Sequence, residues 1–406
     1  MDSTDAQREI SNLKPDVLRL LPMLIFVVVF ALYAITAAPA TLFGDPSEYQ
    51  FIPSILGIAH PPGYAFYTLL AKLWQTLVPV GSIAFRTNLL AAAVGAWTVT
   101  TVYLIACDLQ SASSLAPRPW PLAPLFAALS LAVASDFWQH AIHSNAHIVS
   151  VALAVTHLWL LIRWWRTGRD RWLGAFAITL GWAAAHHPIT LMGIPAYSVF
   201  VLAVRPRILR QWRTLLYLIG CLLLGLTPLL YYPLRSPNVP FGFGPTDMHT
   251  WEGFWRHTTA KGLRVNLFHF GLADQFDRAL VFWSLLRLQF SFPTIVLIAA
   301  GLVWLARRVP KPAVLIYLFL LTHLLFTLNT VQDVMAYLLI PFAALSITAG
   351  TGALALINLL ARRVRNSQPT VGRWLLFIAH CPLFILPICQ GTLNLARGIS
   401  LRDFGA

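Results

Sequence analysis

Long apolar stretches recur along almost the whole chain and are separated by short polar segments. Each stretch is about 20 residues long, which is enough for a helix to cross a ~30 Å hydrocarbon core. The pattern predicts about eleven membrane-spanning helices, at residues 17–39, 86–107, 121–137, 147–164, 172–186, 189–204, 214–232, 291–306, 312–329, 336–360 and 374–395. We therefore expect an all-α integral membrane protein, a polytopic helical bundle that forms a single domain over residues 1–406.

Two segments between the apolar stretches are too long to be simple turns, and we call residues 40–85 and 233–290 the first and second outer loops. The first contains an amphipathic stretch, residues 64–77, in which Lys72 and Gln75 interrupt apolar positions. Such a stretch is typical of a helix that lies in the membrane interface. The second contains tryptophans, which favour the level of the lipid headgroups.

Composition agrees with a membrane protein, because only 11% of the residues are charged, against about 25% in soluble domains. The net charge of +14 by itself suggests a nucleic-acid partner, but the charges are unevenly distributed between the two sides of the membrane. With a cytoplasmic N-terminus, 19 of the 29 lysines and arginines fall in inside segments, as the positive-inside rule expects. The charge therefore indicates topology, with membrane lipids as surroundings, and not nucleic-acid binding. The four cysteines fall within predicted spans without CxxC spacing, which indicates buried apolar side chains.

Acidic residues have the opposite distribution, since nine of the 15 fall on the outer side, and His60, His140, His143, His147, His186 and His187 lie at or near the same face. Candidate chemistry is thus concentrated on one face. This asymmetry predicts an extracytoplasmic active site.

The strongest candidate site lies at the start of the first outer loop, where Asp45 and Glu48 precede His60. One interpretation is structural: Asp45, Pro46 and Glu48 have the spacing of a capping box that starts a helix. In the functional interpretation Asp45 is a general base that takes a proton from an acceptor hydroxyl. Glu48 then orients Asp45 or the acceptor. His60 either donates to a phosphate or sugar oxygen or is a satisfied structural histidine.

Other outer positions are weaker candidates for substrate binding. Arg235 and Arg256 either bind a phosphate or anchor the second outer loop to lipid headgroups. Asp333 and Tyr337 share one helical face, where Asp333 can also be a carboxylate favoured by the helix dipole. His187 ends a predicted span and either faces a cavity or is structural.

The run Gly44-Asp45 to Glu48 and the block Gly57-Ile58-Ala59-His60-Pro61-Pro62-Gly63-Tyr64 resemble the bacterial protein O-mannosyltransferase-like membrane family, a former domain of unknown function. That family is similar to the GT-C class of glycosyltransferases. The resemblance continues through Arg86-Thr87-Asn88, Phe137-Trp138-Gln139, His187-Pro188-Ile189-Thr190, Tyr232-Pro233-Leu234-Arg235 and Asp333-Val334-Met335-Ala336-Tyr337. The chain departs from the family at Asn145-Ala146-His147 and at residues 241–247, which leaves its acceptor and sugar preferences open.

The resemblance implies a hexosyltransferase in a bacterial inner membrane that moves a sugar, mannose above all, from a polyprenyl-phosphate donor to a hydroxyl of a protein or glycan acceptor. It assigns the catalytic base to Asp45 and places Tyr64 among the substrate-binding residues. A monophosphate donor requires no metal to bridge a pyrophosphate, and no carboxylate cluster suited to a metal is evident, so we expect neither metal nor cofactor. The alternatives are a transporter or flippase of lipid-linked or small polar substrates, and a catalytically silent membrane scaffold.

Overall fold

The computed structural model describes residues 15–113, 121–331, 334–365 and 383–399 apart from 384 and 397. Within these ranges the secondary structure is entirely helical. The labelled α-helices are α2 (Pro15–Thr36), α3 (Asp45–Ile55), α4 (Ala65–Leu77), α5 (Ile83–Ala112), α6 (Leu122–Ala132), α7 (Ser135–Ala141), α8 (Ala146–Thr167), α9 (Asp170–Ala184), α10 (Ile194–Val204), α11 (Trp212–Leu226), α12 (Tyr231–Arg235), α13 (Trp251–Thr258), α14 (Gln275–Gln289), α15 (Phe292–Arg308), α16 (Pro310–Leu328) and α17 (Val334–Arg365).

The helices confirm a multi-pass membrane protein. In the described part of the chain, six helices are long and apolar enough to cross a membrane, and two bent pairs raise this number to eight. One pair is α6 with α7, bent by 69°, and the other joins Leu272–Gln289 to α15 at 112°. The expected number of eleven is higher because α9 and the segments Pro188–Val204 and Ile385–Ala396 are shorter helices, and residues 374–382 lie outside the described ranges.

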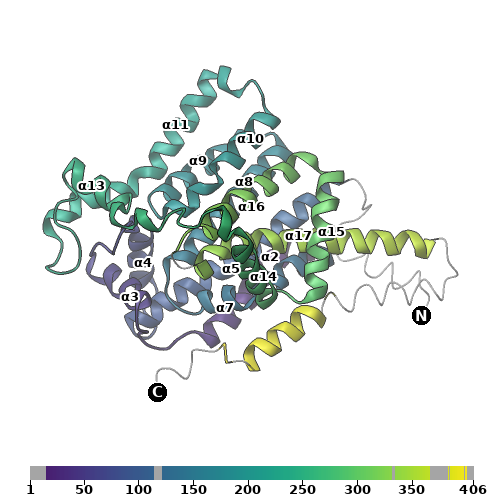
Figure 1. Cartoon of the computed structure of the whole chain (residues 1–406), viewed down its shortest axis with the longest axis horizontal. Helices are drawn as coiled ribbons and strands as arrows, with labels where there is room; N and C mark the ends of the chain where they lie inside the picture. Colours follow the sequence, from purple (N-terminus) through teal and green to yellow (C-terminus); the bar gives the residue numbers. More distant parts are fainter. Residues whose placement is uncertain are drawn as a thin grey trace.

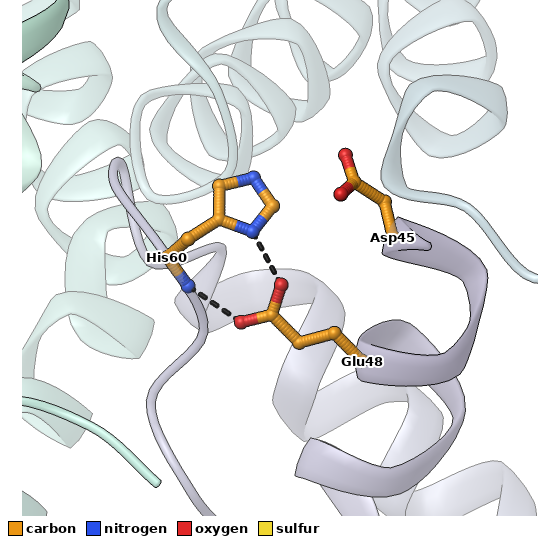
Figure 2. A group of neighbouring side chains, drawn as sticks. All are labelled: Asp45, Glu48 and His60. Carbon is orange, nitrogen blue, oxygen red and sulfur yellow. Dashed lines mark hydrogen bonds and ion pairs between the residues drawn. The ribbon is translucent and has the colours of Figure 1, made fainter. Parts of the chain in front are cut away.

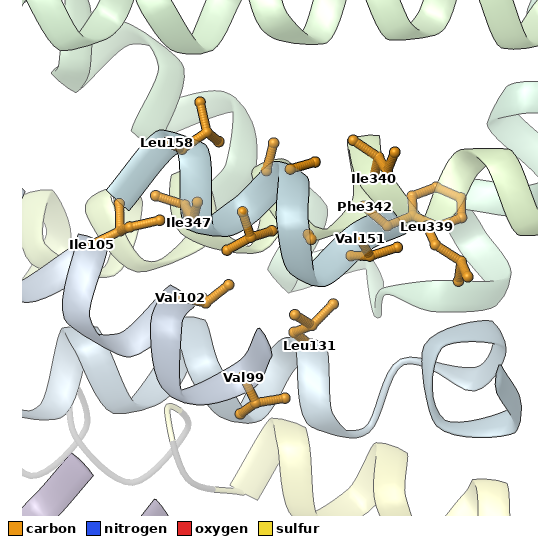
Figure 3. Packing of buried hydrophobic residues seen from close by; sticks show 14 of the residues in the cluster. Val99, Val102, Ile105, Leu131, Val151, Leu158, Leu339, Ile340, Phe342 and Ile347 are labelled. Carbon is orange, nitrogen blue, oxygen red and sulfur yellow. The ribbon is translucent and has the colours of Figure 1, made fainter. Parts of the chain in front are cut away.

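The core lies where α5, α6, α8 and α17 meet (Figure 3). Val102 of α5, Val151 of α8 and Phe342 of α17 are fully buried there. Beside this core α15 and α17 pack backbone to backbone, since a Cβ added at Gly352 would lie 1.9 Å from the carbonyl oxygen of Leu297. Small residues allow such close approach between helices in a bilayer, where van der Waals packing drives association. The central helices therefore form a rigid frame for the loops.

Figure 1 shows α3, α4 and α13 together at one end of the bundle, which we call the α3 end. The helices α2 and α11 expose many large apolar side chains on the flanks of the bundle. Lipid tails can cover such apolar faces without cost, because they are as apolar as the side chains. The polar groups of the loops are thus separated from the flanks and collected at the ends.

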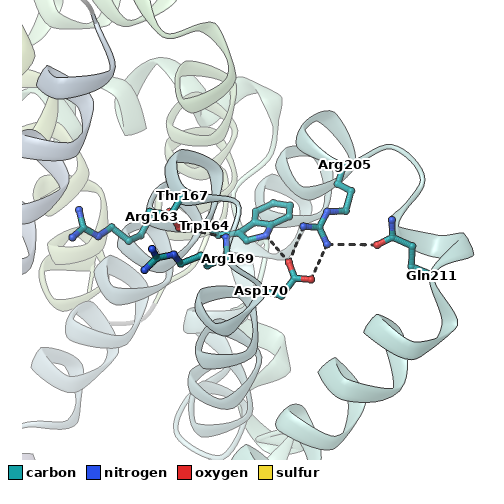
Figure 4. Close-up of polar contacts among 7 residues, drawn as sticks. All are labelled: Arg163, Trp164, Thr167, Arg169, Asp170, Arg205 and Gln211. Carbon is teal, nitrogen blue, oxygen red and sulfur yellow. Dashed lines mark hydrogen bonds and ion pairs between the residues drawn. The ribbon is translucent and has the colours of Figure 1, made fainter.

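Ion pairs also join the helices, and Figure 4 shows the pair of Asp170 and Arg205. Asp170, at the start of α9, accepts two hydrogen bonds from Arg205, at 2.7 and 3.0 Å. Asp108 of α5 is buried and pairs with Arg163 of α8 at 2.5 Å and also with Arg166. Because a buried carboxylate needs a cation partner, these pairs have a structural explanation. They lie away from the candidate site described next.

Candidate active site at the α3 end

Helix α3 begins at Asp45, and the expected capping box is wrong. Its N-cap residue is Gly44, and no side chain caps the helix. Gly44 has φ of 78°, a conformation that glycine adopts at little cost, so the chain turns into the helix one residue earlier than the capping box requires. Ser47 Oγ donates to the Gly44 carbonyl at 2.7 Å. Asp45 is the exposed first residue of α3, where the helix dipole favours a carboxylate but no side chain caps the helix.

Glu48 binds His60 through both of its carboxylate oxygens (Figure 2). Oε1 accepts from the backbone N–H of His60 at 2.8 Å, and Oε2 pairs with Nδ1 of its ring. The Asp45 carboxylate faces the same ring from another side. One potential ligand atom from each of Asp45, Glu48 and His60 lies within 4.8 Å of the others. The sequence placed these three residues in one motif, and the structure shows that Glu48 holds His60.

The pair changes the acidity of both partners. The hydrogen bond to Glu48 raises the pKa of His60, against the opposing effect of burial. Burial alone would raise the pKa of Glu48, but its hydrogen bonds to His60 and the charge of the imidazolium lower it. Opposite charges and hydrogen bonds to the charged form both favour ionisation. The ionised state of the pair, carboxylate with imidazolium, is therefore stabilised.

A row of aromatic rings continues from His60 into the bundle. Tyr64 is buried, its hydroxyl lies 3.5 Å from His60 Nε2, and its ring stacks on His187 with centroids 5.5 Å apart. His187 Nδ1 accepts from the backbone N–H of Ile189 at 3.1 Å, so its proton is on Nε2. Tyr337 of α17 contacts the His187 ring at 5.7 Å between centroids. The structure thus brings Tyr64, His187 and Tyr337 together with His60, as candidates from three separate segments.

Helix α12 leads into the second outer loop and clasps the first outer loop through hydrogen bonds between its side chains and backbone groups. The Tyr232 hydroxyl accepts from the Ala65 N–H at 2.9 Å and donates to the Pro62 carbonyl at 3.0 Å. The Tyr231 hydroxyl donates to the Gly57 carbonyl at 2.6 Å. A Cβ at Gly63, where φ is 93°, would lie 2.7 Å from the Tyr232 hydroxyl oxygen, so a side chain is excluded here. These contacts set the position of residues 57–65, which contain His60.

Arg235 belongs to this clasp. Its Nε donates to the Leu56 carbonyl at 2.7 Å and its Nη2 to the Ile55 carbonyl at 3.1 Å, at the C-terminal end of α3. A cation is favourable there, because the carbonyls at the end of a helix carry partial negative charge. Two guanidinium donors are therefore already bound to the protein, and Arg235 supports α3.

Arg256 and its neighbour His257 lie on α13. Arg256 pairs with Asp247, and its side chain is 51% exposed, at the outer rim of the site. His257 Nε2 donates to the Ala59 carbonyl at 3.0 Å, and burial lowers the pKa of its imidazole. The charge of His60 acts on the same group. His257 was missed as a site residue, because its approach to the first outer loop spans 198 positions of sequence.

Buried amides connect the site to the frame. Asn88 of α5 accepts from Gln50 Nε2 and from the Ser144 N–H, both at 2.9 Å, and donates to the Ala38 carbonyl at 2.7 Å. Gln75 is buried and donates to the Gln50 carbonyl at 3.0 Å. The helix expected near residues 64–77 is confirmed as α4, but Gln75 faces the protein and not water.

A cavity of about 790 Å³ borders the Glu48–His60 pair. Its walls come from α3, the start of α5 and residues 242–245, with Ser54, Ala84 and Phe243 among the lining side chains. Glu48, His60 and His257 also line it. The cavity is mostly apolar, with ionisable groups supplied by these three residues. It offers room for a substrate group beside the paired carboxylate and imidazole.

Asp333 lies outside the described residues. The sequence showed no carboxylate cluster suited to a metal, but folding brings Asp45, Glu48 and His60 together, and all three are metal-ligand types. Each oxygen of Glu48 accepts from a nitrogen of His60.

The fold is that of polytopic GT-C membrane enzymes. ArnT from Cupriavidus metallidurans bound to undecaprenyl phosphate superposes with a TM-score of 0.56 at 16% identity, over 94% of this chain and 72% of that one. The archaeal oligosaccharyltransferase AglB from Archaeoglobus fulgidus, in complex with an inhibitory peptide and a dolichol-phosphate, gives 0.55 at 15% identity, over 95% and 56%. At this identity the likeness establishes the fold alone.

Sequence comparison is more specific. Residues 45–209 match the model of the protein O-mannosyl-transferase TMEM260 N-terminal domain. The chain is 40% identical over 79 residues to protein O-mannosyl-transferase TMEM260 of Mus musculus, which covers 20% of this chain and 11% of that protein. It is 22% identical over 404 residues to the Dictyostelium discoideum protein of that name, covering 90% and 48%. The chain spans about half or less of the length of these relatives. Both are eukaryotic, and a bacterial origin stays a prediction.

Proposed function

We propose that this chain is a membrane glycosyltransferase that moves a hexose, mannose by preference, from a polyprenyl phosphate to an acceptor hydroxyl on protein. The names of its relatives support the reaction, since both are protein O-mannosyl-transferases. The titles of two solved structures with this fold support the donor class, because they name undecaprenyl phosphate and a dolichol-phosphate.

The observation that carries the proposal is the position of the Asp45 carboxylate. It is exposed beside a paired Glu48–His60 at the α3 end and has no capping function. In the proposed reaction Asp45 takes the proton of the acceptor hydroxyl while the hydroxyl oxygen attacks the anomeric carbon. The bond between this carbon and the phosphate oxygen breaks, and its electron pair leaves with the polyprenyl phosphate. The anomeric configuration is inverted, and the carboxylic acid then releases its proton to water.

The leaving group in this reaction is a monophosphate, and we propose that the transfer needs no divalent metal. Glu48 has both oxygens committed to His60, which supports this view. The positive-inside pattern supports an outer location of the site. The acceptor is proposed to enter the cavity that Glu48, His60 and His257 line.

The test is a transfer assay with the purified full chain in liposomes. The donors are polyprenyl-phosphate mannose labelled in the sugar and, as a control, labelled GDP-mannose, and the acceptor is a Ser/Thr-containing peptide. We expect label in the peptide from the lipid-linked donor alone. Label that crosses the membrane without joining the peptide would favour a transporter, and labelling from GDP-mannose would contradict the donor class.

A further inference from the structure

We propose that His60, held by Glu48, is a protonated positioning residue that orients the Asp45 carboxylate. The inference rests on the proposed function, because it assigns Asp45 as the base. It also gives Glu48 a defined role, which is to hold the histidine and not to touch the substrate.

His60 is held through both its backbone and its ring. Glu48 binds its backbone N–H and its ring Nδ1 at once, which fixes the ring relative to the chain. The rings of Tyr49 and Tyr64 pack against it, with centroids 5.9 and 5.4 Å away. An ordinary surface ion pair holds two long side chains loosely. Here the imidazole is held from several sides, so its remaining edge has a fixed direction.

The charges of the two carboxylates favour an imidazolium between them. Asp45 and Glu48 lie three residues apart on one helix, and two carboxylates this close repel each other. The His60 ring lies beside both of them, and as an imidazolium it is attracted to each. The raised pKa of His60 agrees with this arrangement. Several titratable groups face or approach His60. They are Asp45, Glu48 and Tyr49 of α3, Tyr64 before α4, His187 after α9, and His257 of α13.

Asp45 itself is an exposed side chain. It lies at the first position of α3, where no side chain caps the helix. A general base must lie within hydrogen-bond reach of the proton that it removes, and small misplacements are costly. A fixed cation beside the carboxylate supplies the missing constraint. His60 therefore acts through Asp45, and this distinguishes it from a residue that contacts the sugar.

The decisive variant is Glu48→Gln, which keeps the shape of the side chain and an oxygen for the His60 N–H but removes the charge. We expect kcat to fall roughly tenfold with little change in KM for the lipid-linked donor. Activity needs the imidazolium, so it declines as pH rises through the pKa of His60. Without the carboxylate this pKa is lower, and the alkaline decline of kcat moves to lower pH. Glu252→Gln on α13 is the control, because Glu252 is exposed.

His60→Asn is the second variant, since its amide can still donate to Glu48 but carries no charge. We expect the same fall in kcat and no alkaline decline from this residue. If the Glu48→Gln protein keeps the kcat and the pH profile of the active wild type, the inference is overturned and the proposed function stands. If Glu48→Gln does not fold, the same result with His60→Asn overturns the inference. A wild-type protein that yields no product would overturn both.

Discussion

Tyr232 makes two of the hydrogen bonds that clasp the first outer loop through one buried hydroxyl, which makes Tyr232→Phe a sharp perturbation. Phenylalanine keeps the ring and its packing and removes only the oxygen. In the native structure this oxygen accepts from the Ala65 N–H at 2.9 Å and donates to the Pro62 carbonyl at 3.0 Å. Tyr232, Pro62 and Ala65 are all buried. The substitution therefore leaves one donor and one acceptor without partners at the start of α4.

The expected cost follows from these two groups. A buried polar group that loses its partner costs about 1–3 kcal/mol. We expect Tyr232→Phe to lower the free energy of unfolding by about 3 kcal/mol in all, which lies within the range that two such groups give. Transfer activity also falls, since residues 62–65 follow His60 directly and include Tyr64 of the aromatic row.

The free energy is measured by reversible unfolding in mixed detergent micelles, followed by tryptophan fluorescence. Tyr231→Phe is the matched control. Its hydroxyl donates to the Gly57 carbonyl, and the residue is half-buried, so we expect a cost of about 1 kcal/mol. Equal effects of the two substitutions, or a Tyr232→Phe protein as stable and active as the wild type, would refute the view that this hydroxyl holds the first outer loop.

Three further predictions concern the site. Ser54→Trp places an indole in the cavity and is expected to raise the acceptor-peptide KM roughly tenfold, about 1.4 kcal/mol of binding, whereas Thr76→Trp on the exposed side of α4 leaves it unchanged. Stability should depend on pH through the Glu48–His60 pair. The contribution of His60, whose pKa is raised, is full below its ordinary value of 6.5 and is lost as pH rises through the folded pKa. That of Glu48, whose pKa is lowered, is full above its ordinary value of 4.5 and is lost as pH falls through the folded pKa. The stability difference between wild type and Glu48→Gln is thus largest between these values, and a difference that grows toward alkaline pH would contradict the pairing. Finally, EDTA should leave the rate of mannose transfer unchanged, and a rate that falls with EDTA and returns with a divalent cation would show that Asp45, Glu48 and His60 hold a metal.

The helices were predictable from the sequence because a helix that crosses a bilayer needs a long apolar run. A helix also satisfies its backbone hydrogen bonds within one segment, as the bilayer core requires. The group of Asp45, Glu48 and His60 was predictable for a related reason, since only 15 residues separate its first and last members. The start of α3 was not. It depends on the positive φ of Gly44, and the spacing of Asp45 and Glu48 fitted a capping box equally well.

Contacts between distant segments set the rest of the site. The sequence indicated that Arg235 binds a phosphate or anchors a loop, but its partners are carbonyls 179 and 180 positions away. The approach of Tyr232 to Ala65 spans 167 positions. No local sequence pattern predicts such contacts, because they form only when the helices pack. Arg256, by contrast, has a partner nine positions away, yet a cationic side chain in a loop does not reveal which acid it meets.

The central claim, that Asp45 is the base of a sugar transfer, is tested most directly by Asp45→Asn. The measurement is the initial rate of transfer from labelled polyprenyl-phosphate mannose to a peptide, with Asp277→Asn, another exposed acidic residue near a helix start, as control. General-base catalysis contributes about 10²–10⁴-fold, so we expect a loss of at least about 100-fold in Asp45→Asn and none in the control. A folded Asp45→Asn protein that keeps the wild-type rate would contradict the account.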